Sequence, residues 1–104
     1  MAQDDFSVAR NARAVEWLKA EMAAGVGNAF RQLIGGKRES VAESLADTIM
    51  ASYLLGTRVG VSPEDLDARI NRRLAANIKD GHQLERWFGD LSDLLEYRKR
   101  RERS

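Results

Sequence analysis

The chain has 104 residues, of which 17 are basic and 16 acidic, so its formal net charge is +1. This length suits one domain rather than two, and a nearly neutral balance gives no reason to expect a strongly charged partner. The sequence contains no cysteine, which excludes disulfides and thiolate catalysis, and one histidine, which excludes a histidine-pair metal site within one chain.

The N-terminal segment, residues 1–7, contains two aspartates and no apolar run, unlike a signal peptide. No stretch approaches the ~18 apolar residues that cross a bilayer. We therefore expect a cytoplasmic protein with no membrane partner. The predicted organisation is a flexible N-terminus at 1–7, a single helical domain at 8–97, and a basic C-terminal tail at 98–104 that forms a solvated helix end.

The first predicted helix covers residues 8–34, where apolar side chains recur every three or four residues and form one stripe. Gly25 and Gly27 lie inside this segment. Each glycine weakens a helix by ~1 kcal/mol relative to alanine, so we expect another helix to approach closely there. The pair Gly35 and Gly36 is predicted to end the helix.

The second predicted helix begins at Ser40, which forms a capping-box pattern with Glu43. From Ser44 to Thr57 the only charged residue is Asp47, and apolar residues cover nearly the whole circumference. A helix that is apolar all round is enclosed by others. One small domain does not supply enough cover, so the pattern predicts a homo-oligomer, a dimer or larger.

Two further helices are predicted from residue 63 to about 79 and from 83 into the basic tail. Ser62 is the expected N-cap of the former, Pro63 its first residue, and Gly89 is expected to kink the latter. His82 fits a solvated or capping role. With no strand pattern and short connections, we predict an all-α antiparallel bundle of about four helices, completed by oligomerisation.

Acidic residues are the remaining source of chemistry, because Mg²⁺ needs several converging carboxylate oxygens. Glu39, Glu43 and Asp47 have the spacing of one helix face, although the first two also suit a helix start. Asp47 lies among apolar neighbours, where an unpaired buried carboxylate is costly. Two alternatives stay open for Asp47, namely a structural pair and a metal ligand.

Three segments carry a family resemblance: residues 15–21, residues 52–62, and residues 82–92 with their Trp-Phe-Gly-Asp-Leu-Ser run. Together they resemble the short bacterial MazG-like family, a distant branch of the all-α nucleoside triphosphate pyrophosphohydrolases, over roughly residues 10–97. The resemblance implies a MazG-like helical fold. It also implies Mg²⁺-dependent cleavage of a nucleoside triphosphate to a monophosphate and pyrophosphate, where the acidic site is functional.

The resemblance places the family's acidic motifs on positions that mostly lack carboxylates. The first motif falls on Ala24, Gly25 and Asn28, with Arg31 at a further position that is often acidic. The second motif falls on Ser44 and Asp47, so only Asp47 is retained. Without the other acids we predict that Asp47 is buried and bonded to a basic or amide side chain. The candidates, in order, are Arg31, Arg73 and Asn77.

Three functions follow as hypotheses, and no catalytic residue is assigned. The first is a degenerate family member that binds a nucleotide, through Arg73 and Asn77 by family resemblance, or acts as an interaction module. The second is an active Mg²⁺-dependent pyrophosphohydrolase with a rearranged acidic site formed by Glu21, Glu43 and Asp47. The third is nucleic-acid binding by the tail and a basic helix face, which we rank last because acids interleave that face. The basic residues concerned are Arg98 to Arg103 in the tail and Arg69, Arg72 and Arg73 on the helix.

Overall fold

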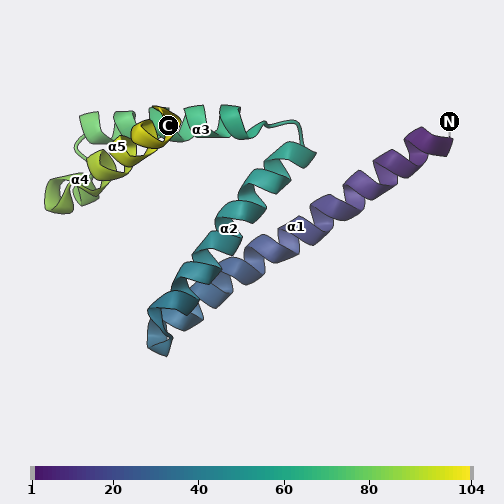
Figure 1. Ribbon diagram of the computed structural model, residues 1–104, viewed down its shortest axis with the longest axis horizontal. Helices are drawn as coiled ribbons and strands as arrows, with labels where there is room; N and C mark the ends of the chain where they lie inside the picture. Colours follow the sequence, from purple (N-terminus) through teal and green to yellow (C-terminus); the bar gives the residue numbers. More distant parts are fainter. Residues whose placement is uncertain (1, 104) are drawn as a thin grey trace. The chain divides into compact units, whose positions relative to one another are not determined.

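The computed structural model describes residues 2–103, and their side chains from residue 6 onward. Over this range the chain forms five helices and no strand (Figure 1), which confirms the predicted all-α class. None of the described helices is long and apolar enough to cross a membrane. The helices are α1 (Ala2–Gly35), α2 (Arg38–Arg58), α3 (Pro63–Lys79), α4 (Gln83–Phe88) and α5 (Asp90–Arg103).

The chain divides into two compact units, Met1–Pro63 and Glu64–Ser104. The first unit contains α1 and α2, and the second contains α3, α4 and α5. The candidate site described below lies within the first unit.

The first unit is an antiparallel hairpin in which α2 runs back along α1 (Figure 1). At the open end, the Asn11 side-chain amide donates a hydrogen bond to the Arg58 carbonyl over 3.2 Å. Few side chains are buried at the contact, and most of these are small. None in the described part of the chain is completely buried. They are Leu18 and Ala29 from α1, and Ser44 and Ala51 from α2.

Gly25 marks a close approach of the two helices. A Cβ atom built on Gly25 would lie 2.5 Å from the Thr48 hydroxyl oxygen and 3.5 Å from the Thr48 backbone. The expected close packing at a helical glycine is therefore confirmed at this position. At Gly27 the expectation is wrong, because a Cβ there would meet only the Arg31 guanidinium, 3.6 Å away on the same helix.

The beginning of α2 differs from the prediction. The helix starts at Arg38 after an extended Lys37, and no side chain caps it. Ser40 and Glu43 consequently lie within the helix, and the predicted capping box at Ser40 is wrong. After the extended Lys37 the backbone is already helical at Arg38, two residues before Ser40. Similarly, α1 begins at Ala2 rather than at residue 8.

In the second unit, α3 begins at Pro63 as predicted, and His82 caps α4 by accepting a hydrogen bond from the Leu84 N–H over 3.1 Å. Gly89 adopts a left-handed conformation with φ of 71° and ends α4. The expected kink is thus a complete break, which is why five helices form rather than about four. A left-handed residue cannot continue a right-handed helix, and glycine adopts this conformation without strain.

A carboxylate clip joins the two helices on either side of this break. Glu85 accepts hydrogen bonds from the Ser92 hydroxyl and, over 2.9 Å, from the Ser92 N–H. These bonds favour the charged carboxylate, so they hold the pKa of Glu85 below its ordinary value of 4.5. The clip satisfies a free N–H at the start of α5 and fixes the turn at Gly89.

The second polar cluster connects α5 to α3 and corrects the predicted basic tail. The Arg98 guanidinium donates to Asp67 over 2.9 Å and to the Asn71 side-chain oxygen over 2.7 Å. The Asn71 amide in turn donates to Glu102 over 2.9 Å. Because the Arg98 side chain is only 11% exposed, this residue is part of the folded unit and not of a solvated tail.

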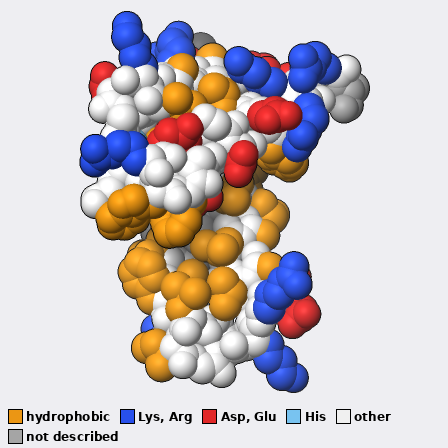
Figure 2. Space-filling model, turned by 90° about the vertical axis from the view of Figure 1, so that its left-hand side faces the viewer, with side chains coloured by type: hydrophobic (Ala, Val, Ile, Leu, Met, Phe, Trp, Pro, Cys, Tyr) orange, Lys and Arg blue, Asp and Glu red, His pale blue; other side chains and the backbone are white. Residues whose placement is uncertain are grey.

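Within the first unit, as far as the structure describes it, α2 is not enclosed by other helices. Its apolar side chains Leu45, Ile49, Met50 and Leu54 are each at least half exposed. Figure 2 shows exposed hydrophobic side chains gathered over the turn end of the hairpin. Within this unit only α1 packs on α2, on one side, so the enclosure of α2 by further copies of the chain stays a prediction.

Candidate functional site

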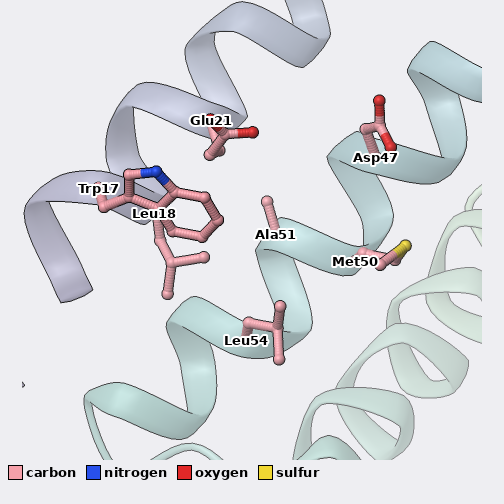
Figure 3. Close-up of a pocket in the computed structure, with 7 residues that line it drawn as sticks. All are labelled: Trp17, Leu18, Glu21, Asp47, Met50, Ala51 and Leu54. Carbon is pink, nitrogen blue, oxygen red and sulfur yellow. The ribbon is translucent and has the colours of Figure 1, made fainter.

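A pocket of about 140 Å³ lies between α1 and α2 (Figure 3). It is apolar except for two carboxylates, Glu21 and Asp47, which stand on facing helices toward the same end of the pocket. Leu18 and Leu54 lie toward the other end. We call this the α1–α2 pocket; its residues are Trp17, Leu18, Glu21, Asp47, Met50, Ala51 and Leu54.

Helical spacing explains why these residues share a pocket. Trp17 and Glu21 are four residues apart, and Asp47, Met50 and Leu54 are spaced by three and four, so each set lies along one side of its helix. Buried Leu18 and Ala51 bring the two sides together. Sequence reasoning missed Trp17, Met50 and Leu54 as site residues, although the spacing of Trp17 and Glu21 was a usable signal.

The structure corrects the predicted burial of Asp47. Its side chain is exposed and, among the described residues, it makes no hydrogen bond or ion pair. An exposed carboxylate keeps its hydration and needs no protein partner. The neighbours of Asp47 in the sequence are apolar, but the large ones, Leu45, Ile49 and Met50, are themselves exposed.

The predicted structural pair of Asp47 and Arg31 is also not formed in the described structure. Arg31 donates instead to the side-chain oxygen of Asn28, one turn earlier on α1. The antiparallel register gives the reason. Gly25 lies opposite Thr48, and Arg31 is six residues farther along α1, about 9 Å beyond the level of Thr48 and about 7.5 Å beyond that of Asp47.

The acidic residues do not fit a resident Mg²⁺ ion. The structure brings Glu21 and Asp47 to one pocket, whereas Glu43, one turn before Asp47, is exposed and does not line it. Within the described residues no group of three acidic, histidine or cysteine side chains is placed to hold a metal. Two carboxylates can hold Mg²⁺ only when substrate phosphates and water complete its shell.

Two positions that the resemblance assigns to acidic motifs lie in the tight contact between the helices. Gly25 is buried against Thr48, and Ser44 is buried one turn away on α2. Gly25 has no space for a carboxylate and a hydrated cation. The remaining positions of the first motif, Ala24 and Asn28, are exposed on α1.

The candidate nucleotide contacts belong to the second unit. Arg73 and Asn77 are both exposed and lie four residues apart on α3, so they share one side of it. Arg69, Arg72 and Arg73 line a surface depression of about 320 Å³. The assignment of nucleotide contacts to Arg73 and Asn77 stays a prediction.

The fold and the pocket define an all-α protein whose candidate site lies between two antiparallel helices. Residues 8–91 match the MazG-like family, and the chain belongs to that family. It is thereby related to the nucleoside triphosphate pyrophosphohydrolase superfamily. No curated protein and no solved structure matches the chain.

Proposed function

We propose that this chain is a MazG-like protein that has lost pyrophosphohydrolase chemistry and acts as a nucleotide-binding or interaction module. The observation that carries the proposal is the packing of Gly25 on Thr48, where a Cβ atom would lie 2.5 Å from the hydroxyl oxygen. A carboxylate at this position would force the helices apart.

Phosphoryl transfer needs cations that neutralise charge on the triphosphate. At the positions of the first acidic motif the chain has Ala24, Gly25 and Asn28. None of these residues has a carboxylate that could bind a metal ion. The carboxylates of Glu21 and Asp47 remain, in a pocket whose other lining residues are apolar. This donor set supports loss of the metal-dependent reaction.

Nucleotide binding is supported by the basic side of α3. Arg69, Arg72 and Arg73 line one depression, and guanidinium groups recognise phosphate oxygens through paired N–H donors. Arg69 also pairs with Asp65 over 3.0 Å, so Arg73 is the better candidate for an anion contact. The family resemblance assigns Arg73 and Asn77 to the same role.

The test combines two measurements on a panel of nucleoside triphosphates with Mg²⁺ or Mn²⁺. We expect no pyrophosphate release near the ~1–10³ s⁻¹ usual for enzymes. In calorimetric titrations, Arg73→Ala should weaken nucleotide binding at least about tenfold, the effect of losing ~1.4 kcal/mol. Arg86→Ala, an exposed arginine on α4, is the matched control and should leave binding unchanged.

The second candidate is an active Mg²⁺-dependent pyrophosphohydrolase with a rearranged acidic site. It is favoured by one observation, that Glu21 and Asp47 line the same pocket. Substrate phosphates would have to complete the metal's coordination. Enzymatic turnover that Asp47→Asn abolishes would establish this candidate and overturn the degenerate assignment.

A further inference from the structure

The Trp-Phe-Gly-Asp-Leu-Ser run, which the candidate site does not use, gives the second unit an exposed aromatic pair. Leu84, Trp87 and Phe88 have the spacing i, i+3 and i+4, so their side chains share one side of α4. They are 42%, 64% and 66% exposed. The rings of Trp87 and Phe88 meet edge to face, with centroids 6.2 Å apart and planes at 82°. We call these three residues the α4 surface.

Local structure fixes the α4 surface in place. Gly89 ends the helix in a left-handed conformation, and Glu85 accepts hydrogen bonds from Ser92 across the break. Because successive helical residues are about 100° apart, Glu85 points about 160° away from Trp87, so the clip to α5 leaves the tryptophan uncovered. A surface that is ordered before binding loses little conformational entropy when a partner covers it.

The α4 surface is small, which limits the kind of partner. A ring side chain buries ~150–250 Å² when it is fully covered, so Trp87 and Phe88 together present on the order of 250 Å². Each partner in a standard interface between folded proteins buries about 800 Å². The surface therefore suits a short segment that binds through a few anchor side chains, rather than a folded domain.

Charge indicates the composition of that segment. Residues 80–97, which include α4 and the first part of α5, have five acidic residues and one basic residue, Arg86, a formal net charge of −4 with histidine neutral. Asp90 and Asp93 follow Phe88 closely in the chain, are exposed, and make no ion pair among the described residues. This charge repels nucleic acids and anionic membranes and attracts a basic segment, whose arginines also stack on tryptophan rings.

We infer that the α4 surface binds a basic amphipathic segment of another protein, with the apolar side of that segment on Trp87 and Phe88. A second copy of this chain is a poorer occupant, because its α4 surface has the same negative charge and its Arg98 is bonded to its own Asp67. The inference rests on the interaction role proposed above. It does not rest on nucleotide binding or on loss of catalysis, which pyrophosphate release and nucleotide titrations test separately.

The first test uses tryptophan fluorescence. The chain has two tryptophans, so Trp17→Phe leaves Trp87 as the only one. The probe is a synthetic helical peptide of leucine, lysine and arginine, apolar on one side and basic on the other. We expect it to shift the Trp87 emission to shorter wavelength, to protect Trp87 from acrylamide, and to bind with a dissociation constant on the order of 10 µM. The same peptide with glutamate at every basic position should bind at least about tenfold more weakly.

The second test uses two pairs of variants in titrations with the basic peptide. Phe88→Ala should weaken binding at least about tenfold. Phe6→Ala is its matched control, because Phe6 is also 66% exposed but lies on α1, and should leave binding unchanged. Asp90→Asn should weaken binding about two- to fivefold, whereas Glu39→Gln should not. Asp90 and Glu39 are both exposed acids in the first turn of a helix, in different units.

Four results would overturn the inference. The first is equal binding of the basic and acidic peptides, and the second is binding that Phe88→Ala leaves unchanged. The third is a larger emission shift of Trp87 with phosphatidylserine vesicles than with the basic peptide. The fourth is protection of Trp87 from acrylamide without peptide: protection that grows with protein concentration would show cover by a second copy, and protection at every concentration would show cover by the chain itself.

Discussion

The α1–α2 hairpin and the α3–α5 unit are held together by different interactions. In the hairpin, small residues such as Gly25, Ser44 and Ala51 let two long helices approach closely, with few polar bonds between them. In the second unit, polar ties join the helices, Arg98 with Asp67 and Asn71 and Glu85 with Ser92, and Leu74 is the buried apolar side chain among its described residues.

This difference predicts different sensitivities. Close packing responds to added volume, because the surrounding backbone cannot move aside without cost. Polar ties respond to loss of a partner and to pH, because a half-buried charge left alone loses its compensation. Variants in the two units therefore test whether each is held as described.

The largest effect is expected at Arg98. Arg98→Ala removes the hydrogen bond to Asn71 and the ion pair with Asp67, whose side chain is only 30% exposed. We expect a loss of about 2–3 kcal/mol in unfolding free energy. Denaturant unfolding followed by circular dichroism measures it. Arg100→Ala is the control, because its pair with Glu96 is exposed and should contribute little.

Gly25→Ala tests the close packing of the hairpin. The added methyl group would collide with Thr48, so we expect a loss of about 1–2 kcal/mol despite the better helix propensity of alanine. Gly27→Ala is the matched control, with only the flexible Arg31 side chain nearby, and should gain about 0.5–1 kcal/mol. Equal melting temperatures for the two variants would contradict the described packing.

Deletion of residues 99–104 should lower the unfolding free energy by less than ~1 kcal/mol. The deletion keeps Arg98 and removes the bond from Asn71 to Glu102 and the Arg100–Glu96 pair, both of which are exposed. Thermal unfolding of the shortened chain measures the change. A larger loss would mean that the tail packs on the body or on a partner copy.

The smallest effect concerns the clip at Glu85. Since its pKa is lowered in the folded chain, its contribution to stability is present above the ordinary value of 4.5 and is lost as pH falls through the folded value. Ser92→Ala removes the hydroxyl donor and should raise the pKa of Glu85 part of the way back. NMR titration of the Glu85 carboxyl carbon measures the shift, and an unchanged value in Ser92→Ala would exclude the clip.

Local signals predicted the helices well. Pro63 marked the first residue of α3 and Gly25 marked a close helix approach, whereas Gly89, expected as a kink, ends α4. The effect of each of these residues depends on its own backbone conformation or size, so it can be predicted without knowing which helices pack together. Ser40 failed as a cap because the turn after Gly36 leads into the helix two residues earlier.

The candidate site was less predictable, because it depends on which helix sides are covered. Asp47 was expected to be buried because the residues beside it in the sequence are apolar. The sequence of α2 alone does not show which of its sides another helix covers, and the structure leaves Asp47 exposed. Pairing of Glu21 with Asp47 in one pocket depends on the register between two helices. The same holds for Arg98, whose partners Asp67 and Asn71 are about 30 residues away in the chain.

The length of α1 has a consequence for amide exchange. The helix runs from Ala2 to Gly35, whereas its hydrogen bond to the far end of α2 is made by Asn11, so its N-terminal end extends past α2 (Figure 1). An unsupported helical end of about nine residues is marginally stable in water. We therefore expect a gradient of deuterium uptake along one continuous helix, with rapid uptake before Asn11 and the slowest around Gly25.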